Sequence, residues 1–194
     1  MPAAEKLDLY KKHRAEYVTP RKPQIVKIKP AQYLSVTGKG EPGGEAFQKQ
    51  VGALYGAAFT IKMKKKFAGR DYKVCRLEAL WWGQRKKAWS WKLLLRVPGF
   101  ITRKDLAAAV KALLDNGKQR EVAEVKLETL KEGTCVQMLH VGPYEAEDAS
   151  IAQMMALAKE HGLSFRGIHH EIYLSDPRRV PPARLRTILR QPVG

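Results

Sequence analysis

The order of apolar patterns along this chain occurs twice, and this repeat limits the folds that are open to it. The first run comprises strands at 25–28 and 33–36, a glycine loop at 38–44, a helix at 47–63 and strands at 72–82 and 89–97. The second comprises strands at 122–130 and 133–141, a helix at 151–158 and strands at 167–174 and 185–189. The last two strands of the first run, and the first two of the second, are each expected to form a hairpin. A duplicated unit of this kind places Glu78 and Glu171 on equivalent strands that face a central cleft.

The predicted organisation is a basic leader with a short helix at 1–23 and a folded domain at 24–194, with halves at about 24–100 and 120–194 joined by a helix at 102–116. Pro20 and Pro23 force an extended connection after the leader. Thr102 caps the joining helix, with Asp105 at its third position.

Composition excludes several classes of protein. The chain has 194 residues, of which 44% are hydrophobic, so it can bury a proper core and disorder is not the default. No apolar stretch approaches the roughly 20 residues of a membrane span, and the N-terminus lacks the apolar segment of a secretion signal. We therefore expect a cytoplasmic protein. Cys75 and Cys135 are too few for a disulfide framework or a zinc site, and we expect neither a metal nor another cofactor.

The formal net charge of +17 raises nucleic acid, an acidic protein surface or an anionic membrane as partners. The basic residues are scattered in short runs such as Arg85-Lys86-Lys87, without the signature of a nucleic-acid module. Charge alone supports only weak, salt-sensitive association with nucleic acid. Most of these runs are expected to be solvated faces, and the sequence does not indicate an oligomeric state.

All four tryptophans, Trp81, Trp82, Trp89 and Trp91, follow closely on Glu78. An ionised carboxylate among aromatic residues must meet water, a donor or a cationic ligand, so the pattern indicates a pocket. The alternatives are that the tryptophans are hydrophobic core and that either glutamate is tied to a neighbouring Arg or Tyr.

Alternation along strands assigns side chains to faces. Glu78 shares a face with Trp82, and Glu171 shares one with His169 and Tyr173, so Glu78, Trp82, Glu171 and Tyr173 are the expected cleft residues. On the other side of their strand, His170, Ile172 and Leu174 are expected to lie beneath the helices.

Four strings of residues resemble the GyrI-like family of small-molecule-binding domains, in its stand-alone subgroup. They are Asp8-Leu9-Tyr10, Leu77-Glu78-Ala79-Leu80-Trp81-Trp82-Gly83, Gln137-Met138-Leu139-His140-Val141-Gly142-Pro143-Tyr144 and His169-His170-Glu171-Ile172-Tyr173-Leu174-Ser175-Asp176-Pro177-Arg178. The resemblance implies an α+β fold of duplicated β-α-β-β units, with a curved antiparallel sheet, helices on its outer face and a central ligand cleft. The leader is too short for the helix-turn-helix module of the family's transcription activators.

The resemblance also implies a function. A pocket glutamate, matched here by Glu171, recognises bulky, often cationic aromatic compounds in the family, and some stand-alone members hydrolyse cyclopropane-bearing compounds that alkylate DNA. Opening such a ring with water requires a base and a proton donor. We expect Glu171 as the base, Glu78 as its partner and Tyr173 or Tyr144 as the donor. The residues expected to line the ligand are Trp81, Trp82, Trp89, Trp91, Tyr33, His169 and His140. The rivals are a binding or sequestering protein without chemistry and a protein that interacts with gyrase.

Overall fold

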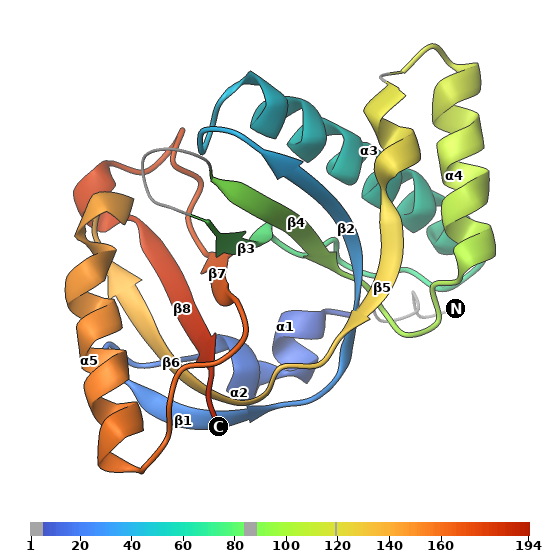
Figure 1. Cartoon of the computed structure of the whole chain (residues 1–194). Helices are drawn as coiled ribbons and strands as arrows, with labels where there is room; N and C mark the ends of the chain where they lie inside the picture. Colours follow the sequence, from blue (N-terminus) through green and yellow to red (C-terminus); the bar gives the residue numbers. More distant parts are fainter. Residues whose placement is uncertain (1–5, 84–88, 119) are drawn as a thin grey trace. The chain divides into compact units, whose positions relative to one another are not determined.

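The computed structural model describes residues 6–83, 89–118 and 120–194 and divides into two compact units (Figure 1). The first unit contains the segment up to His13, Ala31–Cys75 and Trp82–Leu130, and the second contains Arg14–Pro30, Arg76–Trp81 and Lys131–Gly194. Each unit therefore combines three segments of the chain, whereas the predicted halves are consecutive. The reason lies in strand pairing, because β1 and most of β3 pair with strands from the C-terminal segment.

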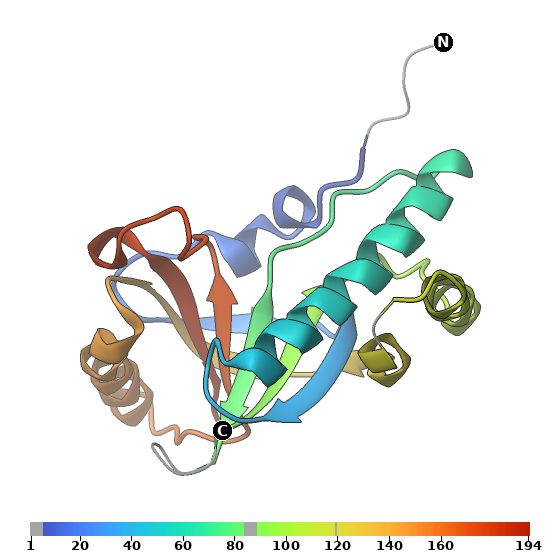
Figure 2. The same cartoon turned by 90° about the horizontal axis from the view of Figure 1, so that it is seen from above.

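The first unit contains three strands and two long helices among its described residues. Its elements are α1 (Leu9–Lys12), β2 (Ala31–Lys39), α3 (Glu45–Phe67), β4 (Ser90–Arg96), α4 (Arg103–Asp115), η1 (Arg120–Glu124) and β5 (Lys126–Leu130). β2 pairs antiparallel with both β4 and β5, and α3 packs on β2 and β4 (Figure 2). The predicted capping box at Thr102 and Asp105 is confirmed at the start of α4.

Trp91 of β4 packs against both α3 and the neighbouring strand β2. Its side chain is fully buried, and its ring meets that of Phe47 on α3 edge to face with centroids 5.3 Å apart. A Cβ atom at Gly38 on the facing strand would lie 2.1 Å from the indole, so only glycine fits there. Trp91 is thus part of the hydrophobic core of the first unit.

The second unit contains five strands in the order β1-β6-β8-β7-β3. Its elements are α2 (Arg14–Tyr17), β1 (Gln24–Ile28), β3 (Glu78–Trp82, in this unit up to Trp81), β6 (Gly133–Val141), η2 (Tyr144–Ala146), α5 (Glu147–Glu160), β7 (His169–Tyr173), η3 (Pro182–Arg184) and β8 (Arg186–Pro192). The pairings between neighbouring strands of this order are all antiparallel. α5 closes one face of β6 and β8 through the apolar cluster Val136, Met138, Met154, Ala158, Leu189 and Val193.

The predicted α+β class and the antiparallel sheet are confirmed. Two predicted details are wrong. The segments 122–130 and 133–141 do not form a hairpin, because β5 pairs with β2 while β6 pairs with β1 and β8. The strand expected at 72–82 is shorter, since Lys73 donates its backbone N–H to Leu7 of the leader and β3 begins only at Glu78. No helix in the described ranges is long and apolar enough to cross a membrane.

Candidate functional site

The register between β3 and β7 determines which predicted site residues share a face. Ala79 lies opposite Glu171 and Trp81 opposite His169, whereas Glu78 lies opposite Ile172. Residues directly opposite in an antiparallel pair project to the same side, and successive residues project to opposite sides. Glu171 and Glu78 therefore point to opposite faces of the second unit, which we call the Glu171 face and the Glu78 face. The expectation that both acids converge on one cleft is wrong.

Helix α5 packs on the Glu171 face. Glu171 lies opposite Leu189 of β8, and Leu189 belongs to the apolar cluster that includes Met154 of α5. His170 and Ile172 project away from α5, to the face that the short helix α2 covers through the contacts of Glu16 and Tyr17. Alternation predicts correctly which residues of β7 share a face. Which of its two faces meets α5 depends on the pairing of β7 with β8.

A directed chain of hydrogen bonds holds Glu171. The indole Nε1–H of Trp81 donates to the Tyr173 hydroxyl oxygen at 2.8 Å, and the Tyr173 O–H donates to Glu171 Oε2 at 2.7 Å. Glu171 Oε1 lies 3.4 Å from His169 Nε2, and both side chains keep some exposure to solvent. Trp81 and Tyr173 thus fix one oxygen of the Glu171 carboxylate. The other oxygen lies beside the imidazole of His169.

The start of α5 completes this group. The ring of Tyr144 in η2 meets that of Tyr173 edge to face, with centroids 5.9 Å apart. Glu147, the first residue of α5, offers a carboxylate oxygen within 4.8 Å of ligand atoms on His169 and Glu171. We call Trp81, Tyr144, Glu147, His169, Glu171 and Tyr173 the Glu171 cluster. Sequence reasoning missed Glu147. The signal that could have found it is an acid in the first helical turn after Gly142-Pro143-Tyr144, since acids are favoured at a helix N-terminus.

Both tyrosines of the Glu171 cluster are protonated at neutral pH. Burial, followed by the negative charge of Glu171, raises the pKa of Tyr144 to about 12. Burial also raises the pKa of Tyr173 well above its usual value, and Glu171 adds to the shift. The proton of Tyr173 is already committed to Glu171, whereas no hydrogen bond of the Tyr144 hydroxyl occurs within the described residues. The predicted role of either tyrosine as a proton donor stays a prediction.

The other acid, Glu78, belongs to a buried ionic network on the opposite face. Glu78 Oε2 lies 3.0 Å from His170 Nε2, and the Tyr17 hydroxyl donates to Glu78 Oε1 at 3.3 Å. On its other side, His170 Nδ1 contacts Glu132 Oε1 at 2.8 Å, and Arg190 Nη1 donates to Glu132 Oε2 at 3.1 Å. Glu78, His170 and Arg190 have no exposure to solvent, and Glu132 has 4%.

The charges of this network compensate one another, which makes its burial tolerable. Burial lowers the pKa of His170, but the carboxylate of Glu132 and then that of Glu78 outweigh this effect and raise the pKa to about 9. Burial raises the pKa of Glu132, but His170 and then Arg190 outweigh this effect and hold the pKa at about 2. At neutral pH His170 and Arg190 are thus both cations, and both contact the carboxylate of Glu132. Arg190 also donates to Gln137 Oε1 and to the backbone oxygen of Glu16, which ties the leader to the sheet.

The remaining predicted ligand residues lie elsewhere. Tyr33 and Trp91 are buried in the first unit, to which the half-buried Trp82 and Trp89 also belong. His140 contacts the Ser150 hydroxyl at 2.9 Å and the Pro143 backbone oxygen at 3.1 Å, so both of its ring nitrogens are engaged. Their roles in ligand binding stay predictions. The basic turn Arg85-Lys86-Lys87 lies outside the described residues.

One group of side chains could hold a metal ion. Glu147, His169 and Glu171 supply two carboxylates and one imidazole, a donor set that suits divalent transition metals. The Tyr173 hydrogen bond to Glu171 would act there as an outer-shell support. The predicted absence of a metal remains a prediction.

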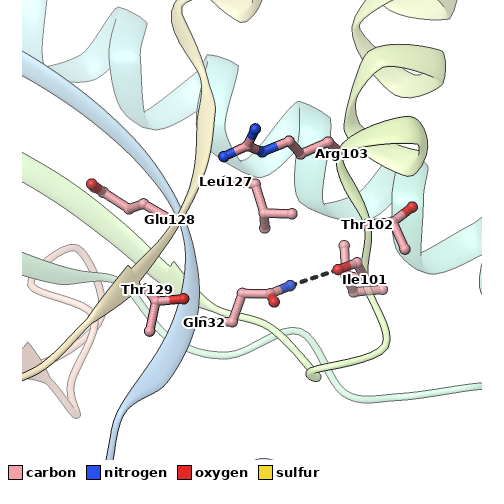
Figure 3. Close-up of a pocket in the computed structure, with 7 residues that line it drawn as sticks. All are labelled: Gln32, Ile101, Thr102, Arg103, Leu127, Glu128 and Thr129. Carbon is pink, nitrogen blue, oxygen red and sulfur yellow. Dashed lines mark hydrogen bonds between the residues drawn. The ribbon is translucent and has the colours of Figure 1, made fainter.

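A pocket of about 310 Å³ lies in the first unit (Figure 3). Its lining residues are Gln32, Ile101, Thr102, Arg103, Leu127, Glu128 and Thr129. The amide of Gln32 donates to the Ile101 backbone oxygen at 2.7 Å, and Lys92 pairs with Glu128 at 3.0 Å. The pocket contains none of the predicted site residues.

Comparison with known proteins supports the resemblance found in the sequence. Residues 21–193 match the GyrI-like small molecule binding domain. A hydrolase from Listeria innocua of known crystal structure is 38% identical, with a TM-score of 0.91 over 97% of this chain and 100% of that chain. A hydrolase encoded by lin2189 from the same organism is 36% identical, with a TM-score of 0.91 over 98% and 100%.

A more distant structure shares the fold alone. The C-terminal domain of EcmrR is 12% identical, with a TM-score of 0.58 over 89% of this chain and 97% of that domain. None of the curated proteins matches the chain.

Proposed function

Because the chain belongs to the family of GyrI-like small molecule binding domains, we propose that its Glu171 cluster binds a bulky planar aromatic or cationic compound and hydrolyses those that carry a cyclopropane ring. The observation that carries this proposal is the chain from Trp81 through Tyr173 to Glu171, with Tyr144 beside it. The hydrolases from Listeria innocua, more than one third identical to this chain, support water as the second reactant.

Glu171 is the general base of this reaction. A cyclopropane fused to a conjugated dienone opens when water attacks its exposed carbon and a ring C–C bond breaks. The bonding electron pair moves through the dienone to the carbonyl oxygen, which becomes a phenolate, and Glu171 takes a proton from the attacking water. The Tyr173 hydrogen bond holds the carboxylate in one orientation, and a positioned base of this kind contributes about 10² to 10⁴ in rate.

Tyr144 is the proton donor. Its neutral hydroxyl protonates the phenolate oxygen, and the proton held by Glu171 returns to Tyr144 as the product leaves. The net change is the addition of one water molecule to the substrate. Glu147 lies next to Glu171, so the two carboxylates give the site a negative charge that favours a cationic ligand and the positive charge that develops on the attacked carbon.

The test uses a cyclopropane-dienone alkylator in ¹⁸O-labelled water, with products followed by mass spectrometry. We expect many turnovers to the labelled water adduct, and a loss of about 10² to 10⁴ in rate for Glu171→Gln. The control is Glu160→Gln at the exposed end of α5, which makes the same chemical change away from the cluster and should keep full activity.

Two outcomes would overturn the hydrolase proposal. Intact ligand bound at one equivalent, with no labelled adduct, would indicate a sequestering protein. Equal rates for Glu171→Gln and Glu160→Gln would remove Glu171 from the reaction. Comparing Tyr144→Phe with Tyr173→Phe tests the donor, because the first should abolish proton donation while the second mainly misorients Glu171. An unaffected Tyr144→Phe variant would exclude Tyr144 from that role.

A further inference from the structure

A second hollow of about 590 Å³ lies in the second unit and contains none of the Glu171 cluster. Leu139 and Val141 of β6 line it together with Val180. Arg21, Arg184 and Arg186 add three guanidinium groups, and we call this site the arginine groove. Its volume falls in the range of about 300–1,000 Å³ that is usual for small-molecule sites.

The arginine groove is on the Glu78 face. Val141 lies opposite Arg186, and two residues further along Leu139 lies opposite Ile188. Met138 and Leu189, which project to the other side of the same strands, pack against α5. The groove and the Glu171 cluster therefore occupy opposite faces of the second unit, so a ligand in one does not touch the other.

Hydrogen bonds hold the segments around the groove in place. Leu139 donates its backbone N–H to the oxygen of Pro20 at 2.8 Å, which fixes the segment that carries Arg21. Arg186 donates its backbone N–H to the Ser175 hydroxyl at 3.1 Å, and Leu174 donates to the Arg186 oxygen at 2.9 Å. The backbone around the groove is thus arranged before any ligand arrives.

The positive charge of the groove is not matched locally. Asp176 is the acid of the neighbouring loop, and Arg178 binds it at 2.9 Å and 3.0 Å while Arg179 lies 3.8 Å away. The hydrogen bonds from Arg178 hold the pKa of Asp176 at about 2. In the ranges that the structure describes, no ion pair involves Arg21, Arg184 or Arg186. The groove therefore combines surplus guanidinium groups with an apolar floor.

From this combination we propose that the arginine groove binds a small organic anion, an apolar or aromatic body that carries a carboxylate, sulfonate or phosphate group. Guanidinium groups bind such oxyanions through paired hydrogen bonds, which are stronger than bonds between neutral groups. Leu139, Val141 and Val180 bury the apolar body. This site goes beyond the proposed hydrolase activity and depends on different residues.

The test uses naphthalene-2-sulfonate as the probe and isothermal titration calorimetry on the full chain. We expect one site, with affinity at least about tenfold weaker in Arg184→Gln/Arg186→Gln, because charge-assisted hydrogen bonds are lost. The matched control is Lys104→Gln/Lys118→Gln, which removes the same charge at exposed positions of the first unit and should bind as wild type does. Glu171→Gln should also bind the probe normally, so failure here and failure of the hydrolase proposal are distinguishable.

Three results would overturn the proposal. Equal affinity for the uncharged 2-naphthalenemethanol would reduce the groove to an apolar surface. Equal weakening by the lysine control would reduce the effect to general attraction of anions. Inorganic phosphate that binds as tightly as the sulfonate would remove any role for the apolar floor. Folding of the arginine variant is checked by circular dichroism, and the conservative Arg184→Lys/Arg186→Lys variant should retain intermediate affinity.

Discussion

His170 and Glu171 are consecutive residues of β7, yet they belong to opposite kinds of site. His170 is fully buried between Glu78 and Glu132, and every charge near it has a partner. Glu171 is partly exposed, is held on one oxygen by Tyr173 and faces a second carboxylate at Glu147. Compensation of charge makes the burial of His170 tolerable on one face, whereas on the other two carboxylates lie close together and Glu171 keeps some exposure to solvent.

The comparison also shows what the leader contributes. On the Glu78 face, Tyr17 donates to Glu78 and the backbone oxygen of Glu16 accepts from Arg190. These contacts close the ionic network to water. On the Glu171 face the covering element is α5, whose first turn leaves Tyr144 and Glu147 beside Glu171. The leader thus covers the ionic network on the Glu78 face, whereas α5 leaves Glu171 partly exposed on the other.

The largest effect is expected from Glu132→Gln. This change removes the carboxylate that binds both His170 and Arg190, and leaves two buried cations without it. Breaking a buried ion pair costs about 3–5 kcal/mol, which urea unfolding followed by tryptophan fluorescence measures. The control Glu128→Gln disrupts the half-exposed pair with Lys92 and should cost about 0–1 kcal/mol. Similar losses in both variants would contradict a special role for the buried network.

The pH dependence of stability is the next test. The folded state raises the pKa of His170 to about 9, above its unperturbed value of about 6.5, so its contribution is complete below about pH 6.5 and is lost as pH rises through 9. The folded state lowers the pKa of Glu132 to about 2, so its contribution is complete above about pH 4.3 and is lost as pH falls. The urea midpoint should be highest between these limits.

Imidazole NMR isolates His170 from other groups that titrate at alkaline pH. Both ring nitrogens of His170 should still carry protons at about pH 8, where an unperturbed histidine has lost one. A neutral His170 at that pH would mean that the two carboxylates do not hold it as a cation.

The sequence predicts most elements because their signals are local. The apolar stripe and C-terminal lysines of α3 and the capping box of α4 can be recognised without any partner. Alternation likewise places Glu171 and Tyr173 on one face of β7, and the hydrogen bond between them confirms it.

The ionic network escapes sequence reasoning because its members come from distant segments. Glu132 lies in an ordinary polar turn before Gly133, and it meets His170 and Arg190 only because β6, β8 and β7 are adjacent. The face on which Glu78 lies depends on register, since a shift of one residue between two strands moves every side chain of a strand to the other face of the sheet. Alternation shows which residues of one strand share a face. It does not show which residues of the neighbouring strand lie on the same face.

Substitutions of Tyr173 and Tyr17 are expected to have smaller effects on stability and to differ in their effect on ligand binding. Tyr173→Phe removes a donor to Glu171 and an acceptor for Trp81, and we expect a loss of about 1–2 kcal/mol in stability together with weaker binding of an acridinium cation. Tyr17→Phe removes the longer bond to Glu78, and we expect a loss of about 1 kcal/mol with unchanged binding. Urea unfolding and fluorescence titration measure the two quantities. Equal effects on binding would contradict the separation of the two faces.

The smallest change in stability is expected from Glu171→Gln. The amide oxygen can still accept the hydrogen bond from Tyr173, and loss of one charge beside Glu147 relieves repulsion, so the free energy of unfolding should stay within about 0.5 kcal/mol of wild type. Glu78→Gln makes the same change on the other face, where it leaves the buried His170 cation with one carboxylate fewer and should cost several times more. Urea unfolding of the two variants side by side measures this difference. A cost for Glu171→Gln as large as that for Glu78→Gln would mean that Glu171 is part of the structural core, and the Glu171 cluster would lose its claim to be the ligand site.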